Sequence, residues 1–83
     1  MSANETQARA DEVLATVLRT LRVRGYDVTA STSVGWNSYY CADVVSVRLM
    51  LDSEATRRDR SIANHAVREA LIAANVAHNV TVA

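Results

Sequence analysis

The stretch "CADVVSVRLMLD", residues 41–52, decides the fold. Every second residue in it is apolar, and those that share one side are Val45, Val47, Leu49 and Leu51. The opposite side is mixed and carries Val44, Ser46, Arg48 and Met50. Because side chains of an extended chain point alternately to its two faces, this pattern predicts a strand with one buried face.

The stretch before it, "YDVTASTSV" at residues 26–34, alternates in the same way and predicts a second strand. Turn-forming residues lie between the two, namely Gly35, Asn37 and Ser38. The sequence therefore predicts an antiparallel hairpin. If the alternation continues through the turn, Tyr39 and Cys41 face the core and Tyr40 faces away from it.

An amphipathic helix is predicted before the hairpin, because apolar residues recur at three- and four-residue spacing from Ala10 to Leu21. We expect Asn4 to cap its start, with Gln7 in the reciprocal position. Gly25 stands where a residue with positive φ would end it.

A second helix is predicted after the hairpin, with Asp52 or Ser53 as its cap and an alanine-rich apolar stripe from Ile62 to Ala74. The final stretch, "VAHNVTVA" at residues 76–83, predicts a short strand with His78 at its start.

These elements predict one small α+β domain over residues 1–83, with residues 1–4 disordered, since a chain of this length supports a single core. The order is α-β-β-α-β. Placing the first strand between the other two gives a two-layer sandwich with a three-stranded antiparallel sheet of order 2-1-3 and both helices on one face. The second strand is then an edge. The order of elements resembles the ferredoxin-like plan without its first strand, which is a likeness of topology alone.

The charge balance argues against a general attraction to nucleic-acid backbones or anionic membranes, because nine basic residues, all Arg, offset nine acidic ones. A single cysteine cannot form an internal disulfide, and the sequence has no apolar run long enough to span a bilayer. We therefore expect a cytoplasmic protein that does not enter membranes.

Catalytic and metal-binding motifs are not recognisable. Cys41 is the one candidate nucleophile, with Asp43, His65 and His78 as the available partners, yet none of them lies in a known spacing. Two isolated glycines cannot form a phosphate-binding loop. We expect no enzymatic activity, no catalytic residue, no metal, no cofactor and no small-molecule substrate.

The leading hypothesis is a protein-interaction module that uses the aromatic loop, the open sheet face and the edge of the second strand. The residues expected to bind protein are Trp36, Tyr40, Val44, Arg48 and Met50. The partner is another protein or a second copy of this chain. Small domains of this kind are common among regulators encoded by phages and mobile elements, so we expect such a source.

Nucleic-acid binding is the alternative hypothesis. It uses Arg57, Arg58 and Arg60, with Trp36 or Tyr40 stacking on bases. Acidic residues balance this basic cluster within the same segment, namely Asp52, Glu54 and Asp59. The other interpretation of this segment is therefore a solvent-exposed helix start whose arginines pair with these acidic residues and do not contact phosphate.

Overall fold

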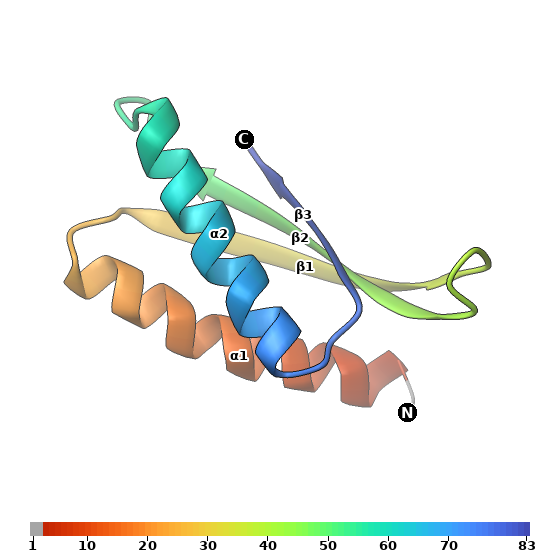
Figure 1. Ribbon diagram of the computed structural model, residues 1–83. Coiled ribbons are helices and arrows are strands. Elements are labelled where there is room, and N and C mark those ends of the chain that lie inside the picture. Colours follow the sequence, from red (N-terminus) through yellow and green to blue (C-terminus); the bar gives the residue numbers. More distant parts are fainter. Residues whose placement is uncertain (1–2) are drawn as a thin grey trace.

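The computed structural model describes residues 3–83 and shows two helices against a three-stranded sheet (Figure 1). The elements follow in the order α1 (Ala3–Val23), β1 (Val28–Asn37), β2 (Ala42–Leu51), α2 (Arg57–Ala73) and β3 (His78–Val82). The α+β class and the α-β-β-α-β order predicted from the sequence are confirmed.

The sheet order is β1-β2-β3, so β2 is the middle strand. β1 runs antiparallel to it, from Val28 opposite Leu51 to Asn37 opposite Ala42. β3 runs parallel to it, with Val47 opposite Val80. The sheet is therefore mixed, and the predicted antiparallel order 2-1-3 is wrong. The edges are β1 and β3, whereas β2 was expected at an edge.

Hydrophobic burial explains why β2 takes the centre. Val45, Val47 and Leu49 are fully buried on the face that the helices cover. Val44, on the opposite face, is also only 9% exposed. A strand that is apolar on one whole face and on part of the other gains most from having a neighbour on each side.

Both helices cover the same face of the sheet, as predicted (Figure 1). α1 contributes Leu14, Leu18 and Leu21 to the core, and α2 contributes Ala63, Val67 and Leu71. Neither helix of residues 3–83 covers the opposite face (Figure 1). Its exposed residues are Thr29, Ser31, Ser33, Gly35, Ser46, Arg48, Met50, Asn79 and Thr81.

The two helices end in the same way. At the end of α1, Gly25 has a φ of 97°, its N–H donates to Arg22 O, and Tyr26 N–H donates to Leu21 O. At the end of α2, Asn75 has a φ of 58° and takes the place of the glycine. This pairing of bonds is the Schellman motif, which satisfies the last carbonyl groups and turns the chain toward the sheet. The predicted role of Gly25 is confirmed.

The helix starts differ from the predictions. α1 already includes Ala3 and Asn4, so Asn4 is not the cap and these two residues are not disordered. Residues 1–2, also predicted to be disordered, lie outside the described part of the chain. α2 is capped by Thr56, whose side chain accepts from Asp59 N–H while the Asp59 carboxylate accepts from Thr56 N–H. This capping box outcompetes Asp52 and Ser53 because it satisfies two backbone donors at once.

Across residues 3–83, neither helix combines the length and the apolar character that crossing a bilayer requires.

Candidate interaction surface at the hairpin end

The loop that joins β1 to β2 is held by Asn37. Its side-chain oxygen accepts hydrogen bonds from the N–H groups of Tyr39 (2.9 Å) and Tyr40 (3.2 Å). The loop covers residues 38–41, so Gly35 and Trp36 belong to β1 instead of the predicted turn. Cys41 closes the loop with a φ of 51°. An Asx-type turn of this kind fixes the direction in which the two tyrosines leave the backbone.

Three aromatic side chains are exposed at this end of the molecule. Trp36 is 67% exposed, Tyr39 86% and Tyr40 66%. The two tyrosine rings meet edge to face, with centroids 5.0 Å apart and planes at 86°. The fourth aromatic residue, Tyr26, is half-buried and packs against the core. Most of the aromatic surface of this chain therefore faces solvent.

The predictions for Tyr39 and Cys41 are wrong, because both were expected to face the core and both are exposed. The four-residue loop interrupts the strand alternation on which those predictions relied. The positive φ of Cys41 also turns its side chain out of the pleat, and its thiol donates to Ser38 O at 3.4 Å.

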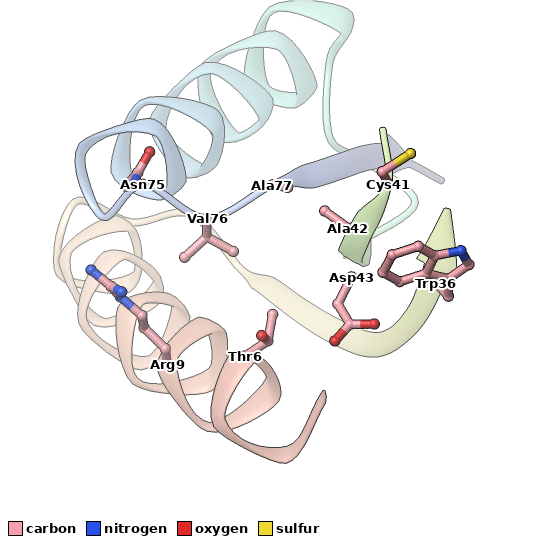
Figure 2. A pocket seen from close by; sticks show the side chains of 9 residues that line it. All are labelled: Thr6, Arg9, Trp36, Cys41, Ala42, Asp43, Asn75, Val76 and Ala77. Atoms are coloured by element: carbon pink, nitrogen blue, oxygen red, sulfur yellow. The ribbon is translucent and has the colours of Figure 1, made fainter. Parts of the chain in front are cut away.

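A hollow of about 390 Å³ lies on the helix side of the hairpin end (Figure 2). Three segments far apart in the sequence line it, and the residues are Thr6, Arg9, Trp36, Cys41, Ala42, Asp43, Asn75, Val76 and Ala77. Figure 2 shows Arg9 and Asp43 on opposite sides, with Thr6 and Val76 between them. The hollow thus offers a cation, an anion and an aromatic wall around a partly apolar floor.

A second hollow, of about 540 Å³, lies beside the hairpin and reaches the open sheet face. Its lining includes Tyr40, Val44 and His78, which also line a smaller adjoining hollow. His78 Nδ1 lies 2.8 Å from Val76 O. Because a carbonyl oxygen can only accept, Nδ1 carries the proton and donates it, which leaves Nε2 to interact with a ligand.

Three of the five residues predicted to bind protein come together here. Trp36, Tyr40 and Val44 all line the second hollow. Arg48 and Met50 lie farther along β2 on the same face, and Met50 is 44% exposed. They extend the surface along the sheet without joining the aromatic cluster.

The residues of the nucleic-acid hypothesis are separated. Arg57, Arg58 and Arg60 lie at the start of α2, at the opposite end of the molecule from the hairpin loop (Figure 1). The Arg60 guanidinium donates to Ala83 O and also to Asp52 O, so it is engaged within the fold. Trp36 and Tyr40 cannot act together with this cluster on a short ligand.

The residues considered for catalysis do not all meet. Cys41 and Asp43 line the first hollow and His78 lines the second, whereas His65 lies apart on the exposed side of α2. Within residues 3–83, no group of three or more His, Cys, Asp or Glu side chains is placed to hold a metal ion.

Some residues of the surface were not predicted from the sequence. Thr6, Arg9 and Asn75 reach the first hollow, and Arg68 and Asn79 reach the second, from elements that the sequence does not place beside the hairpin. Of the surface residues that were not predicted, only Tyr39 could have been identified from the sequence, because it lies in the same aromatic-rich stretch as Tyr40.

Comparison with known proteins found no matching family model, no matching curated protein and no matching solved structure.

Proposed function

We propose that this chain is a non-enzymatic protein-binding module whose hairpin end docks onto another protein. The observation that carries the proposal is the exposure, by about two-thirds or more, of Trp36, Tyr39 and Tyr40 at one end of the fold. Aromatic side chains offer large contact areas with few rotatable bonds, and they dominate the energetics of protein interfaces.

The shape of the surface around these aromatic residues supports the same proposal. Hollows on both sides of the hairpin end give a partner's side chains places to insert, and Trp36 lines both of the larger ones. Val44 and His78 flank Tyr40 in the smaller hollow. Arg48 and Met50 would add contacts at the margin of the interface, where side chains contribute less. The cytoplasm is the compartment we propose, because the single cysteine is exposed and unpaired.

Nucleic-acid binding is the second candidate, and one observation favours it in a changed form. The hollow beside the hairpin combines Arg68, Asn79 and Ser46 with Trp36 and Tyr40. A cation and hydrogen-bonding groups next to aromatic rings suit an unpaired nucleotide. In this version the cation is Arg68, which also donates to Asn64 Oδ1 (2.9 Å) and Val80 O (3.1 Å), in place of the cluster at the start of α2.

Replacing Tyr40 with alanine tests the proposal. We expect proteins retained from a lysate by the wild-type chain to be lost, and the affinity for the purified partner to fall about tenfold or more, as for a central aromatic contact. The matched control is Ile72→Ala, because Ile72 is 60% exposed against 66% for Tyr40 but lies on α2. The affinity is measured by titration calorimetry with the purified partner.

Equal affinities for the Tyr40→Ala and Ile72→Ala variants would contradict the proposed surface. Release of the retained material by nuclease, together with binding that weakens steeply as salt is added, would instead favour the nucleic-acid candidate.

A further inference from the structure

The two edges of the sheet are protected to different degrees. β3 has only five residues, and Arg68 from α2 covers part of its outer edge, because Arg68 Nη2 donates to Val80 O at 3.1 Å. Arg60 donates to Ala83 O just after the end of the strand. Short length and covering charged side chains are common means by which edge strands avoid pairing with other chains.

The hydrogen bonds of β2 show which backbone groups of β1 are free. Val45 N–H donates to Ala77 O and Ala83 N–H donates to Leu49 O, both at 2.9 Å, so the odd-numbered residues of β2 direct their backbone groups to β3. The even-numbered residues therefore face β1, because successive residues of a strand point in opposite directions. Their partners in β1 are Thr29, Ser31, Ser33, Gly35 and Asn37.

The alternate residues of β1 direct their backbone groups away from the sheet. Val28 is one of these, and its carbonyl accepts from Arg22 Nε (3.2 Å) and Nη2 (3.1 Å). Within residues 3–83, the residues that remain without such cover at this edge are Ala30, Thr32, Val34 and Trp36. With one N–H and one C=O each, they present eight groups. β1 reads "VTASTSVGWN" and contains no charged residue and no proline, so the usual protection against strand addition is absent from it.

We propose that two copies of this chain pair antiparallel through the β1 edge, about a two-fold axis that passes beside Ser33. This register places Ala30 opposite Trp36 of the second copy and Thr32 opposite Val34. The two-fold axis repeats each of these two pairs with the copies exchanged, so the interface has four hydrogen-bonded pairs. In an antiparallel ladder each such pair exchanges two hydrogen bonds, so all eight groups of each copy are satisfied.

This register is preferred because it uses all four free residues and leaves out Val28, which Arg22 already covers. It sets the large Trp36 against the small Ala30. β1 itself carries no charge, and Asp11, which contacts it from α1, accepts from Thr32 Oγ1 at 3.0 Å on the covered face and not along the backbone edge. A second copy thus provides a hydrogen-bonding partner for each free backbone N–H and C=O group of these four residues.

The pairing joins the two sheets with their helix-covered faces on the same side. Directly opposite residues of an antiparallel pair point to the same face, so the helices of both copies would cover one side of a six-stranded sheet. Ser33 lies on the other, open face, where it is exposed. The proposal deepens the proposed interaction function by naming one partner, and it uses backbone groups that are distinct from the Tyr39 and Tyr40 side chains.

The substitution Ser33→Cys tests both the dimer and its register. Ser33 would face Ser33 of the second copy in a non-hydrogen-bonded pair with a Cα separation of about 4.5 Å, which lies within the disulfide range of roughly 4.4–6.8 Å. In a Cys41→Ser background, Ser33→Cys is expected to form a covalent dimer on mild oxidation. The matched control is Ser31→Cys, which is exposed on the same face but lies opposite Gly35.

The expected result is about tenfold more disulfide-linked dimer for Ser33→Cys than for Ser31→Cys on non-reducing gels, with a wild-type dimer in analytical ultracentrifugation. A wild-type monomer at about 100 µM, or equal cross-linking of the two variants, would overturn the proposal. A wild-type monomer whose β1 amides become protected from exchange only with a purified partner would also overturn it and assign the edge to a foreign strand. Tyr40→Ala should leave the cross-linking unchanged, so failure of the dimer and failure of the aromatic surface are distinguishable.

Discussion

Replacing Leu49 with alanine is expected to lower the free energy of unfolding by about 3 kcal/mol. Leu49 is fully buried in the middle strand, between Ala30 on β1 and Val82 on β3. The truncation leaves a cavity that neighbours on both sides cannot fill. A domain of this size has roughly 4–12 kcal/mol of total stability, so the loss is a large part of it.

Met50→Ala is the matched control for this prediction. Met50 is the next residue of β2 and is similar in size to leucine, but it lies on the open face and is 44% exposed. Its truncation should cost less than about 1 kcal/mol. Urea unfolding followed by far-ultraviolet circular dichroism gives both values. Similar losses for the two variants would show that the covered and open faces of β2 are not as different as described.

Replacing Val44 with glutamate is expected to destabilise the fold by about 2–4 kcal/mol, because it buries an unpaired carboxylate. From the sequence, Val44 and Met50 are equivalent open-face positions that should both tolerate glutamate. The structure distinguishes them, since Val44 is only 9% exposed and shares a hollow with Tyr40 and His78.

The contrast with Met50→Glu makes this prediction measurable. For Met50→Glu we expect a change in melting temperature of a few degrees at most, whereas Val44→Glu should lower it by about 10–20 °C. Thermal unfolding at neutral pH, where this carboxyl group is ionised in the unfolded chain, provides the comparison. Equal melting temperatures would contradict the burial of Val44.

The elements and their buried faces could be predicted from the sequence because they depend on local periodicity. The alternation around Val45 and Leu49 is enough to place both on the core face. The neighbours of each strand depend on long-range pairing, which periodicity does not encode. One local cue was present, since an apolar Val44 on the supposedly open face is typical of a strand with neighbours on both sides.

Turn and cap positions were harder to predict because several residues could fill each role. Asp52 was a plausible cap for α2, and in the structure its carboxylate accepts from Glu54 N–H at 3.0 Å in a separate turn. Gly35 suggested a turn that actually begins after Asn37. Each outcome depends on which side chain satisfies more backbone donors in three dimensions.

The candidate surface was predictable only where it is local. The aromatic residues are close together in the sequence, so Trp36 and Tyr40 could be singled out. Arg9 and Asn75 reach the same hollow only because the start of α1 and the turn after α2 lie beside the hairpin end. Sequence composition and periodicity do not predict which distant segments meet in this way.

The position of Trp36 also determines what can be measured optically. Its indole, the only one in the chain, is 67% exposed beside the hairpin loop, whereas the core consists of aliphatic side chains. Fluorescence emission depends on the polarity around the indole, and that polarity differs little between this position and an unfolded chain. The wavelength of tryptophan emission should therefore shift little on unfolding but should respond to any molecule that covers the hairpin end, so complex formation can be followed without an added label.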